Sequence, residues 1–300
     1  MFHLSHSIMA VASLLATYPV ACTLGEGLHF SARLNRLFWV DIKAPALFAL
    51  CLQSRDIQRI AMPEPIGWIK ETTEGRWIAG FQSGVYWLNA HFEQAGKVCE
   101  LPNEPATNRL NDAKSDREGR LYFGSMDNNE QQPSGKLYRL SAEGAAEVDH
   151  GYVVSNGPAF SVSGEYLYTV SSAERVIYRA RVNNAGGLTD KQPFIQFSAS
   201  DGYPDGLTVD ANDRIWVACW QGYGIRCYAP TGKLIRHFML PAPQVTNVLF
   251  AGSAFDTLFV TTARIGLNDT LLNRYPLSGA VFALDVKQQG IAEQLVALTP

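Results

Sequence analysis

Five side chains that can bind a cation through oxygen lie at widely separated points of the 300-residue chain: Glu26, Asn111, Asn156, Asp205 and Asn247. Hard and borderline divalent ions prefer such oxygens, so calcium, magnesium and manganese are the first candidates, with zinc and ferrous iron as further ones. Taken singly, these residues more often cap turns, because Asn and Asp beside Gly, as in SNG and PDG, are common turn formers. They form a metal site only if the fold brings them together.

An internal repeat supplies the strands that could bring these five residues together. A small turn followed by an apolar strand occurs six times, as LNRLFWVDI, EGRWIAGF, EGRLYFGSM, SGEYLYTVSS, NDRIWVACW and FDTLFVTTA. The first strand residues of the copies are 40, 44, 46, 48 and 43 residues apart. A second apolar strand follows each copy, as in ALFAL or GKLYRL, and another precedes it, as in GEGLHF or DGLTVD. No convincing amphipathic helix intervenes.

Units of this length, built from three or four strands, are typical of propeller blades. The sequence therefore predicts an all-β chain folded as a six-bladed β-propeller, with residues 1–13 as an N-terminal tail and residues 14–300 as a single domain. We expect residues 14–21 to form a strand that completes a blade from the opposite terminus. A β-sandwich is the alternative, but it would not require six nearly equal units.

The repeat also sets the register of the oxygen donors. Glu26, Asn111, Asn156, Asp205 and Asn247 all stand ten or eleven residues before the first strand residue of their units. In a propeller the innermost strands line a central channel, so equivalent positions form a ring. Turn capping does not require this shared register, which favours a cation site at the mouth of the channel.

Bulk composition excludes several classes of partner. The formal net charge of −3 and the lack of any Lys/Arg block argue against nucleic acid. The five cysteines are odd in number and form no C-x-x-C motif, a pattern typical of reduced thiols and a cytoplasmic location. The apolar residues 8–22 are preceded by no Lys or Arg and are too short to span a bilayer, so we expect neither an export signal nor a membrane segment.

Other catalytic chemistry has little support in the sequence. The six histidines show no metal-ligand spacing, and no G-x-S-x-G elbow indicates a serine nucleophile. The isolated GEG and GYG are turn glycines and not a phosphate loop. Trp39, Trp77, Trp87 and Trp216 fall at strand positions and are interpreted as core residues.

Five groups of motifs follow one another from Leu24 through nearly the whole chain: LGEG with FWVDI, NRLNDAKSD with GRLYFGSM, SNGPAFS, PDGLTVD with IWVACW, and LPAPQVTNVLFAG with LFVTTAR. Together, in this order and spacing, they resemble the regucalcin and gluconolactonase family of metal-dependent sugar lactonases. The resemblance implies a six-bladed propeller, in agreement with the repeat count. It implies that Glu26, Asn156 and Asp205 bind one divalent cation and that Arg109 and Asn111 bind substrate hydroxyls.

The family also has an acidic substrate contact shortly after the third-blade strand. In MDNNEQQ this role falls on Glu130, or on Asn129 in another alignment. The implied activity is hydrolysis of an aldonolactone of the gluconolactone or pentonolactone type, with Asp205 as general base and the metal polarising the carbonyl. The alternatives are a non-catalytic calcium-binding propeller scaffold and a metal-dependent esterase or phosphotriesterase, since propellers have many functions.

Overall fold

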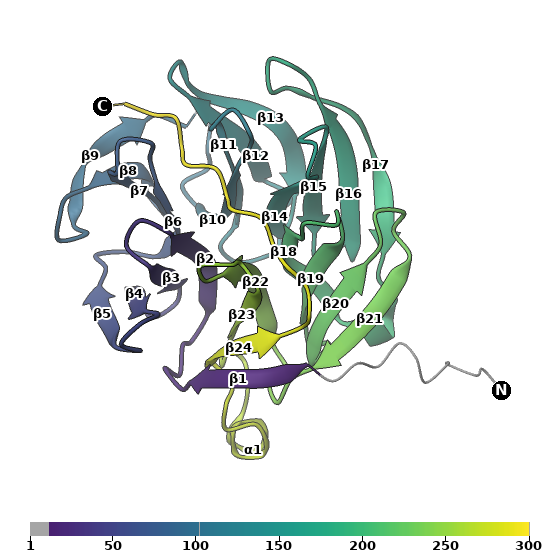
Figure 1. Ribbon diagram of the computed structural model, residues 1–300. Coiled ribbons are helices and arrows are strands. Elements are labelled where there is room, and N and C mark those ends of the chain that lie inside the picture. Colours follow the sequence, from purple (N-terminus) through teal and green to yellow (C-terminus); the bar gives the residue numbers. More distant parts are fainter. Residues whose placement is uncertain (1–11, 102, 300) are drawn as a thin grey trace.

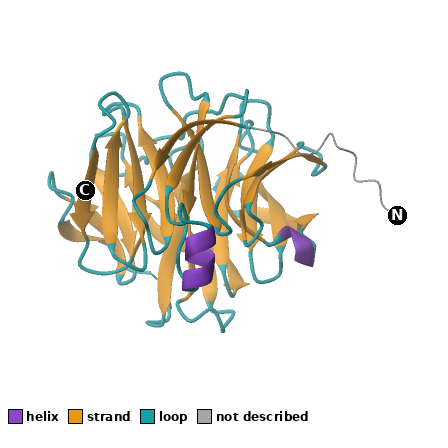
Figure 2. Ribbon diagram, turned by 90° about the horizontal axis from the view of Figure 1, so that it is seen from below, coloured by secondary structure: helices purple, strands orange, loops and turns teal. Residues whose placement is uncertain are grey.

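Six four-stranded antiparallel sheets surround a central axis in the computed structural model, which describes residues 12–101 and 103–299 (Figure 1). The strands run from one face of the molecule to the other (Figure 2). The six-bladed all-β propeller expected from the repeats is confirmed. Of the expected tail, residues 1–11 lie outside the described residues, so the proposed domain limits stay a prediction.

The strands of the first three blades follow chain order from the axis outward. They are β2 (Gly25–Ser31), β3 (Arg36–Asp41), β4 (Ala46–Cys51) and β5 (Ile57–Ala61); β6 (Ile66–Glu71), β7 (Trp77–Phe81), β8 (Gly84–Leu88) and β9 (Gln94–Cys99); and β10 (Asn108–Ser115), β11 (Leu121–Asp127), β12 (Gly135–Ser141) and β13 (Gly144–Tyr152). The six repeated segments correspond to the second strands of the blades, as the sequence predicted.

The fourth and fifth blades have the same arrangement, and the sixth takes one strand from the N-terminus. Their strands are β14 (Ser155–Phe160), β15 (Tyr166–Ser171), β16 (Val176–Val182) and β17 (Leu188–Gln196); β18 (Tyr203–Val209), β19 (Ile215–Trp220), β20 (Gly224–Tyr228) and β21 (Leu234–Met239); and β22 (Val245–Ala251), β23 (Thr257–Thr262), β24 (Val281–Asp285) and β1 (Ser13–Tyr18).

The ring is closed by strands from both ends of the chain. β1 pairs antiparallel with β24, with Tyr18 opposite Val281, so the last blade contains three C-terminal strands and one N-terminal strand. The predicted closing strand is thus confirmed, although it ends at Tyr18 and not at residue 21. Pairing covers the edge of β24, which would otherwise be open.

Large aromatic side chains pack within the blades and between neighbouring ones. Trp216 of β19 stacks on Phe238 of β21, with ring centroids 5.6 Å apart, and meets Phe250 of β22 edge to face. Trp39 of β3 stacks on Phe48 of β4 at 5.2 Å. The tryptophans assigned to the core are buried, and the five cysteines are free, with Cys219 and Cys227 buried in the core.

In the described ranges two short helices occur outside the sheets: the 3₁₀ turn η1 (Ala199–Asp201) before β18, and α1 (Asp269–Arg274) between β23 and β24. The sequence analysis did not predict α1, because six residues are too few to show a helical period. Its start is capped by the Asn268 side chain, which accepts a hydrogen bond from the Leu271 N–H at 3.0 Å. No helix in the described part of the chain is long and apolar enough to cross a membrane.

The segment after β24, residues 286–299, crosses one face of the ring and is named the C-terminal strap (Figure 1). Its backbone bonds to three other blades in turn: the Ala211 N–H donates to Gln289 O, the Val296 N–H to Glu71 O and the Ala297 N–H to Gly119 O, at 2.8, 3.0 and 2.8 Å. The strap therefore covers the end of the channel where the innermost strands finish.

Candidate metal and substrate site

An open cavity of about 500 Å³ lies at the other end of the channel, where the innermost strands begin. All three predicted cation ligands and all three predicted substrate contacts line it: Glu26, Asn156, Asp205, Arg109, Asn111 and Glu130. Glu130 lies in the cavity wall and Asn129 does not, which favours the first of the two alignments. The fold thus brings together residues that are up to 179 positions apart, counted from Glu26 to Asp205.

A backbone irregularity in each innermost strand occurs where these residues stand. The register of β2 shifts between Glu26 and His29, and that of β18 shifts between Pro204 and Leu207. Such a bulge re-aims side chains and is common beside functional sites. Gly27 has φ of 61°, and a Cβ there would meet the carbonyl oxygen of Gly67 in the next blade. Glycine therefore permits the backbone shape that directs Glu26 into the cavity.

Glu26 and Asp205 form no ion pair with a basic side chain in the described part of the chain, although buried acids usually do, and the charge of Arg109 acts on Glu26 from beyond ion-pair distance. Glu26 is 3% exposed and accepts hydrogen bonds from Asn247 Nδ2 at 2.9 Å and from the Gly27 N–H at 3.1 Å. Burial first, and then the charge of Asp112, raise its pKa to about 8. Burial and then Glu26 raise the pKa of Asp205 well above its usual range. The cavity therefore contains negative charges that repel one another.

Amide groups complete the wall between the third and fifth blades. Asn111 Nδ2 donates to Asn156 Oδ1 at 2.7 Å and to Ser155 O at 2.6 Å. Asn156 Nδ2 donates to Ser172 Oγ at 3.0 Å, and that hydroxyl donates to Pro204 O at 2.7 Å. These bonds fix the orientation of the Asn156 amide, and its oxygen, which accepts one hydrogen bond, keeps a second lone pair for another partner.

This donor set fits a divalent cation. Two buried carboxylates with raised pKa values and one fixed amide oxygen are hard oxygen ligands that a positive charge would stabilise. Within the described ranges, no group of three His, Cys, Asp or Glu side chains is placed to bind a metal. A set made of two carboxylates and an amide is consistent with that finding, because Asn156 takes the third position.

The sequence analysis missed a polar column below the cavity. Asp112 is 8% exposed and accepts a hydrogen bond from Asn247 Nδ2 at 3.3 Å, so one amide joins it to Glu26. Burial raises the pKa of Asp112 to about 6. The charge of Lys70, a side chain that is 3% exposed, opposes this rise in part. Asp112 belongs to the NRLND motif and could have been noticed there; Lys70 gave no signal in the sequence.

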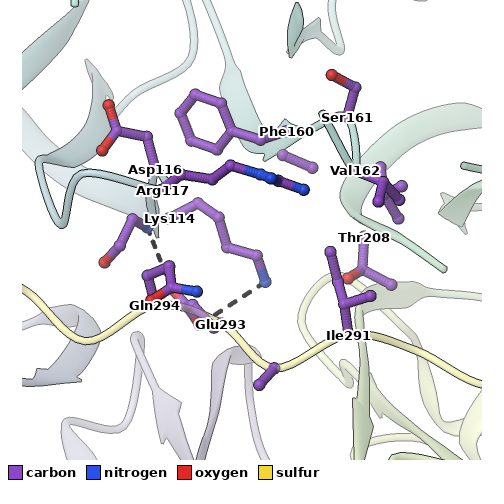
Figure 3. Close-up of a pocket in the computed structure, with 14 residues that line it drawn as sticks. Lys114, Asp116, Arg117, Phe160, Ser161, Val162, Thr208, Ile291, Glu293 and Gln294 are labelled. Atoms are coloured by element: carbon purple, nitrogen blue, oxygen red, sulfur yellow. Dashed lines mark hydrogen bonds and ion pairs between the residues drawn. The ribbon is translucent and has the colours of Figure 1, made fainter. Parts of the chain in front are cut away.

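A second cavity of about 500 Å³ lies under the C-terminal strap at the opposite end of the channel (Figure 3). Figure 3 shows the Lys114 side chain directed toward Glu293 of the strap. The Glu293 carboxylate lies 2.8 Å from Lys70 Nζ and 3.7 Å from Lys114 Nζ. The buried Glu293 carboxylate thus forms ion pairs with two ammonium groups. It is the counter-ion of the two lysines at this end of the channel.

The propeller and its oxygen-lined cavity define the class of protein, and the comparisons identify the family. Residues 24–264 match the family model described as the SMP-30/Gluconolactonase/LRE-like region. The chain therefore belongs to this family, as the motifs predicted. The chain is similar to a 6-deoxy-6-sulfogluconolactonase of Pseudomonas putida, with 33% identity over 276 residues that cover 91% of this chain and 95% of the relative.

Two further similarities agree with that assignment. An L-arabinolactonase of Azospirillum brasilense is 29% identical over 283 residues, which cover 93% of each chain. The fold matches the crystal structure of a calcium-binding regucalcin from Agrobacterium tumefaciens with a TM-score of 0.92, at 24% identity, over 97% of this chain and 100% of that one. At that identity the structural match shows the fold alone. Because the relatives that carry an enzyme name are lactonases, among them a pentonolactonase of Haloferax volcanii, the enzyme class of the chain is lactone hydrolase.

Proposed function

We propose that the protein hydrolyses a sugar lactone, of the gluconolactone or pentonolactone type, to the aldonic acid. The observation that carries the proposal is the convergence of Glu26, Asp205 and Asn156 on one cavity with two carboxylates of raised pKa. Such a group of acids is unstable without a cation, and acids of perturbed pKa mark functional sites. The names of the lactonase relatives support the reaction class.

Glu26, Asn156 and Asp205 would bind the cation, which when bound supplies a Lewis acid toward the lactone carbonyl. Asp205 accepts a proton from the attacking water, whose oxygen forms the new bond to the carbonyl carbon. The bond from that carbon to the ring oxygen then breaks, and the ring oxygen takes up the proton that Asp205 accepted, which restores the carboxylate. General base assistance of this kind contributes about 10²–10⁴-fold.

Arg109, Asn111 and Glu130 would hold the lactone ring. Arg109 Nη1 donates to Asn111 Oδ1, and Asn111 is fixed in turn on Asn156 and Ser155, so the two side chains form one rigid edge. A rigid edge orients the ring so that water attacks from one face. These are roles that the geometry permits and that substitution can test.

The direct test is release of acid from D-glucono-, D-xylono- and L-arabinonolactone, with and without EDTA. We expect a rate above spontaneous hydrolysis that EDTA abolishes and added divalent cation restores. Asp205→Ala and Asn156→Ala should lose metal and activity together, whereas Arg109→Ala should mainly raise KM. Near-normal turnover by metal-stripped Asp205→Ala would refute the mechanism.

Two other outcomes identify the alternatives. A protein that binds calcium but opens no lactone in the panel would be the non-catalytic scaffold. Cleavage of aryl esters or phosphotriesters without lactone opening would identify the other hydrolase class. Both assays use the same preparation and the same metal titration.

A further inference from the structure

Two basic side chains line the active-site cavity, and neither forms an ion pair with a described acidic residue, although the charge of Glu130 acts on both. Arg109 lies on β10, and Lys43 lies in the turn between β3 and β4. None of the ion pairs among the described residues involves either side chain. Buried or half-buried cations normally have such a partner, so the pair requires an explanation.

Arg109 is the more unusual of the two. It is 3% exposed, and its guanidinium donates only to neutral oxygens, those of Leu110 O at 3.4 Å and the Asn111 amide. Its Nε is buried and finds no hydrogen-bond partner in the described part of the chain. A guanidinium has five N–H donors arranged to bind carboxylate, sulfonate or phosphate oxygens in pairs. Arg109 therefore has unused donors inside the cavity.

Lys43 is held in place by a contact from another blade. Its ammonium donates to Asn128 Oδ1 at 2.8 Å, which joins the first blade to the loop after β11 in the third. That bond uses one of three N–H donors. Burial first, and then the charge of Arg109, lower the pKa of Lys43, so the two cations are near enough to repel one another. A flexible surface lysine would not need such a tether.

The second cavity shows how this fold neutralises buried cations elsewhere. There, Glu293 lies 2.8 Å from Lys70 Nζ and 3.7 Å from Lys114 Nζ. In the active-site cavity the carboxylates of Glu26 and Asp205 would be offset by the divalent cation. The exposed carboxylate of Glu130 then stands alone opposite two basic groups. An excess of positive charge remains on that side of the cavity.

We propose that Arg109 and Lys43 form a subsite for an anionic group on the lactone, so that the preferred substrate is a sugar lactone with a sulfonate, phosphate or carboxylate substituent and not a neutral one. The proposal rests on the lactonase function and names the substrate class of the same site. Charge-assisted hydrogen bonds to such a group are the strong kind. Each contributes about tenfold or more in affinity.

The test compares D-glucono-1,5-lactone with the same lactone carrying a phosphate or a sulfonate on carbon 6, and with a lactone that carries a carboxylate there. We expect wild-type kcat/KM to be at least about tenfold higher for one or more of the acidic lactones, chiefly through a lower KM. The three acidic substrates show which anion fits. The readout is kcat/KM for the acidic lactone divided by kcat/KM for the neutral one. Lys43→Met should reduce this ratio about tenfold, and Lys43→Arg should retain most of it. The control Lys233→Met removes the same charge from an exposed loop and should leave the ratio at the wild-type value.

Equal kcat/KM for neutral and acidic lactones in the wild type, or an unchanged ratio in Lys43→Met, would overturn the subsite while the lactonase function stood. If no lactone were opened, the subsite could still be tested by calorimetry, which compares the affinity of the protein for 6-phosphogluconate with its affinity for gluconate. Tighter binding of the phosphorylated acid to wild type than to Lys43→Met supports the subsite, and equal binding excludes it. The two proposals can therefore fail separately.

Discussion

In the metal-free protein, stability should fall as the pH rises from about 5 to 8, and calcium should restore it. Burial first, and then Asp112, raise the pKa of Glu26 to about 8, whereas a Glu in an unfolded chain has a pKa of about 4.3. Throughout this interval the folded state binds more protons than the unfolded state. Unfolding therefore releases protons, and each increase in pH favours it.

The size of the change in the free energy of unfolding follows from the difference between the folded and the unfolded pKa of Glu26. Each unit of pKa is about 1.4 kcal/mol, so Glu26 by itself changes the free energy of unfolding by on the order of 4 kcal/mol across the interval. Asp205, whose pKa is also raised by burial and then by Glu26, adds to the effect. Calcium competes with these protons, because only an ionised carboxylate is a ligand. With a pKa of about 8, Glu26 is about half ionised at pH 8 and about 1% ionised at pH 6, so calcium affinity should fall about 50-fold or more.

Two measurements test this reasoning. Scanning calorimetry of EDTA-treated, dialysed protein at pH 5.5, 6.5, 7.5 and 8.5, with and without calcium chloride, gives the stability. Titration calorimetry at the same pH values gives the affinity. Glu26→Gln should reduce the pH dependence and lose the response to calcium, while Glu118→Gln, which changes an exposed carboxylate, should resemble wild type. A metal-free melting temperature that is constant or rises with pH, or equal calcium affinity at pH 6 and 8, would refute the argument.

Three further predictions concern the strap and the closure of the ring. Glu293→Ala removes the carboxylate 2.8 Å from the buried Lys70 Nζ. It should lower the free energy of unfolding, measured by urea denaturation, by about 3–5 kcal/mol. A decrease below about 1 kcal/mol would contradict the buried ion pair. Burial opposes ionisation of Glu293, but Lys114 and Lys70 outweigh it and lower its pKa well below the usual value, so its contribution is present above about pH 4.3 and is lost as the pH falls through the folded pKa. Acid should therefore destabilise wild type more than Glu293→Gln in melting experiments between about pH 4.5 and 2. Deletion of residues 1–18 removes β1 and exposes the edge of β24, and it should lower the melting temperature by several degrees, so an unchanged melting temperature would show that β1 does not stabilise the ring.

The fold was predictable because it repeats. Alternation of small turns with apolar strands is a local property, and six copies with nearly equal spacing specify blades without knowledge of their contacts. The closing strand was also predictable, because an apolar N-terminal segment needs a partner and the last blade lacked one. The short helix α1 was not predictable, since it arises from one cap and a loop of six residues.

The candidate site was partly predictable for the same reason. Glu26, Asn111, Asn156 and Asp205 hold equivalent positions in their units, so the symmetry of the ring brings them together. Lys43 and Glu293 hold no equivalent positions. Lys43 lies in a turn whose direction depends on Asn128 of another blade, and Glu293 lies in the strap after the last repeat.

The sequence alone therefore determined the number of blades, the way the ring closes and the set of oxygen donors around the channel, because each follows from a pattern that recurs along the chain. Only the tertiary structure decided which charges are paired. It placed Glu293 between Lys70 and Lys114, whereas Arg109 and Lys43 form no ion pair with any described residue and share the exposed carboxylate of Glu130. Pairing of charges depends on distances between side chains from different blades, and such distances have no periodic trace in the sequence.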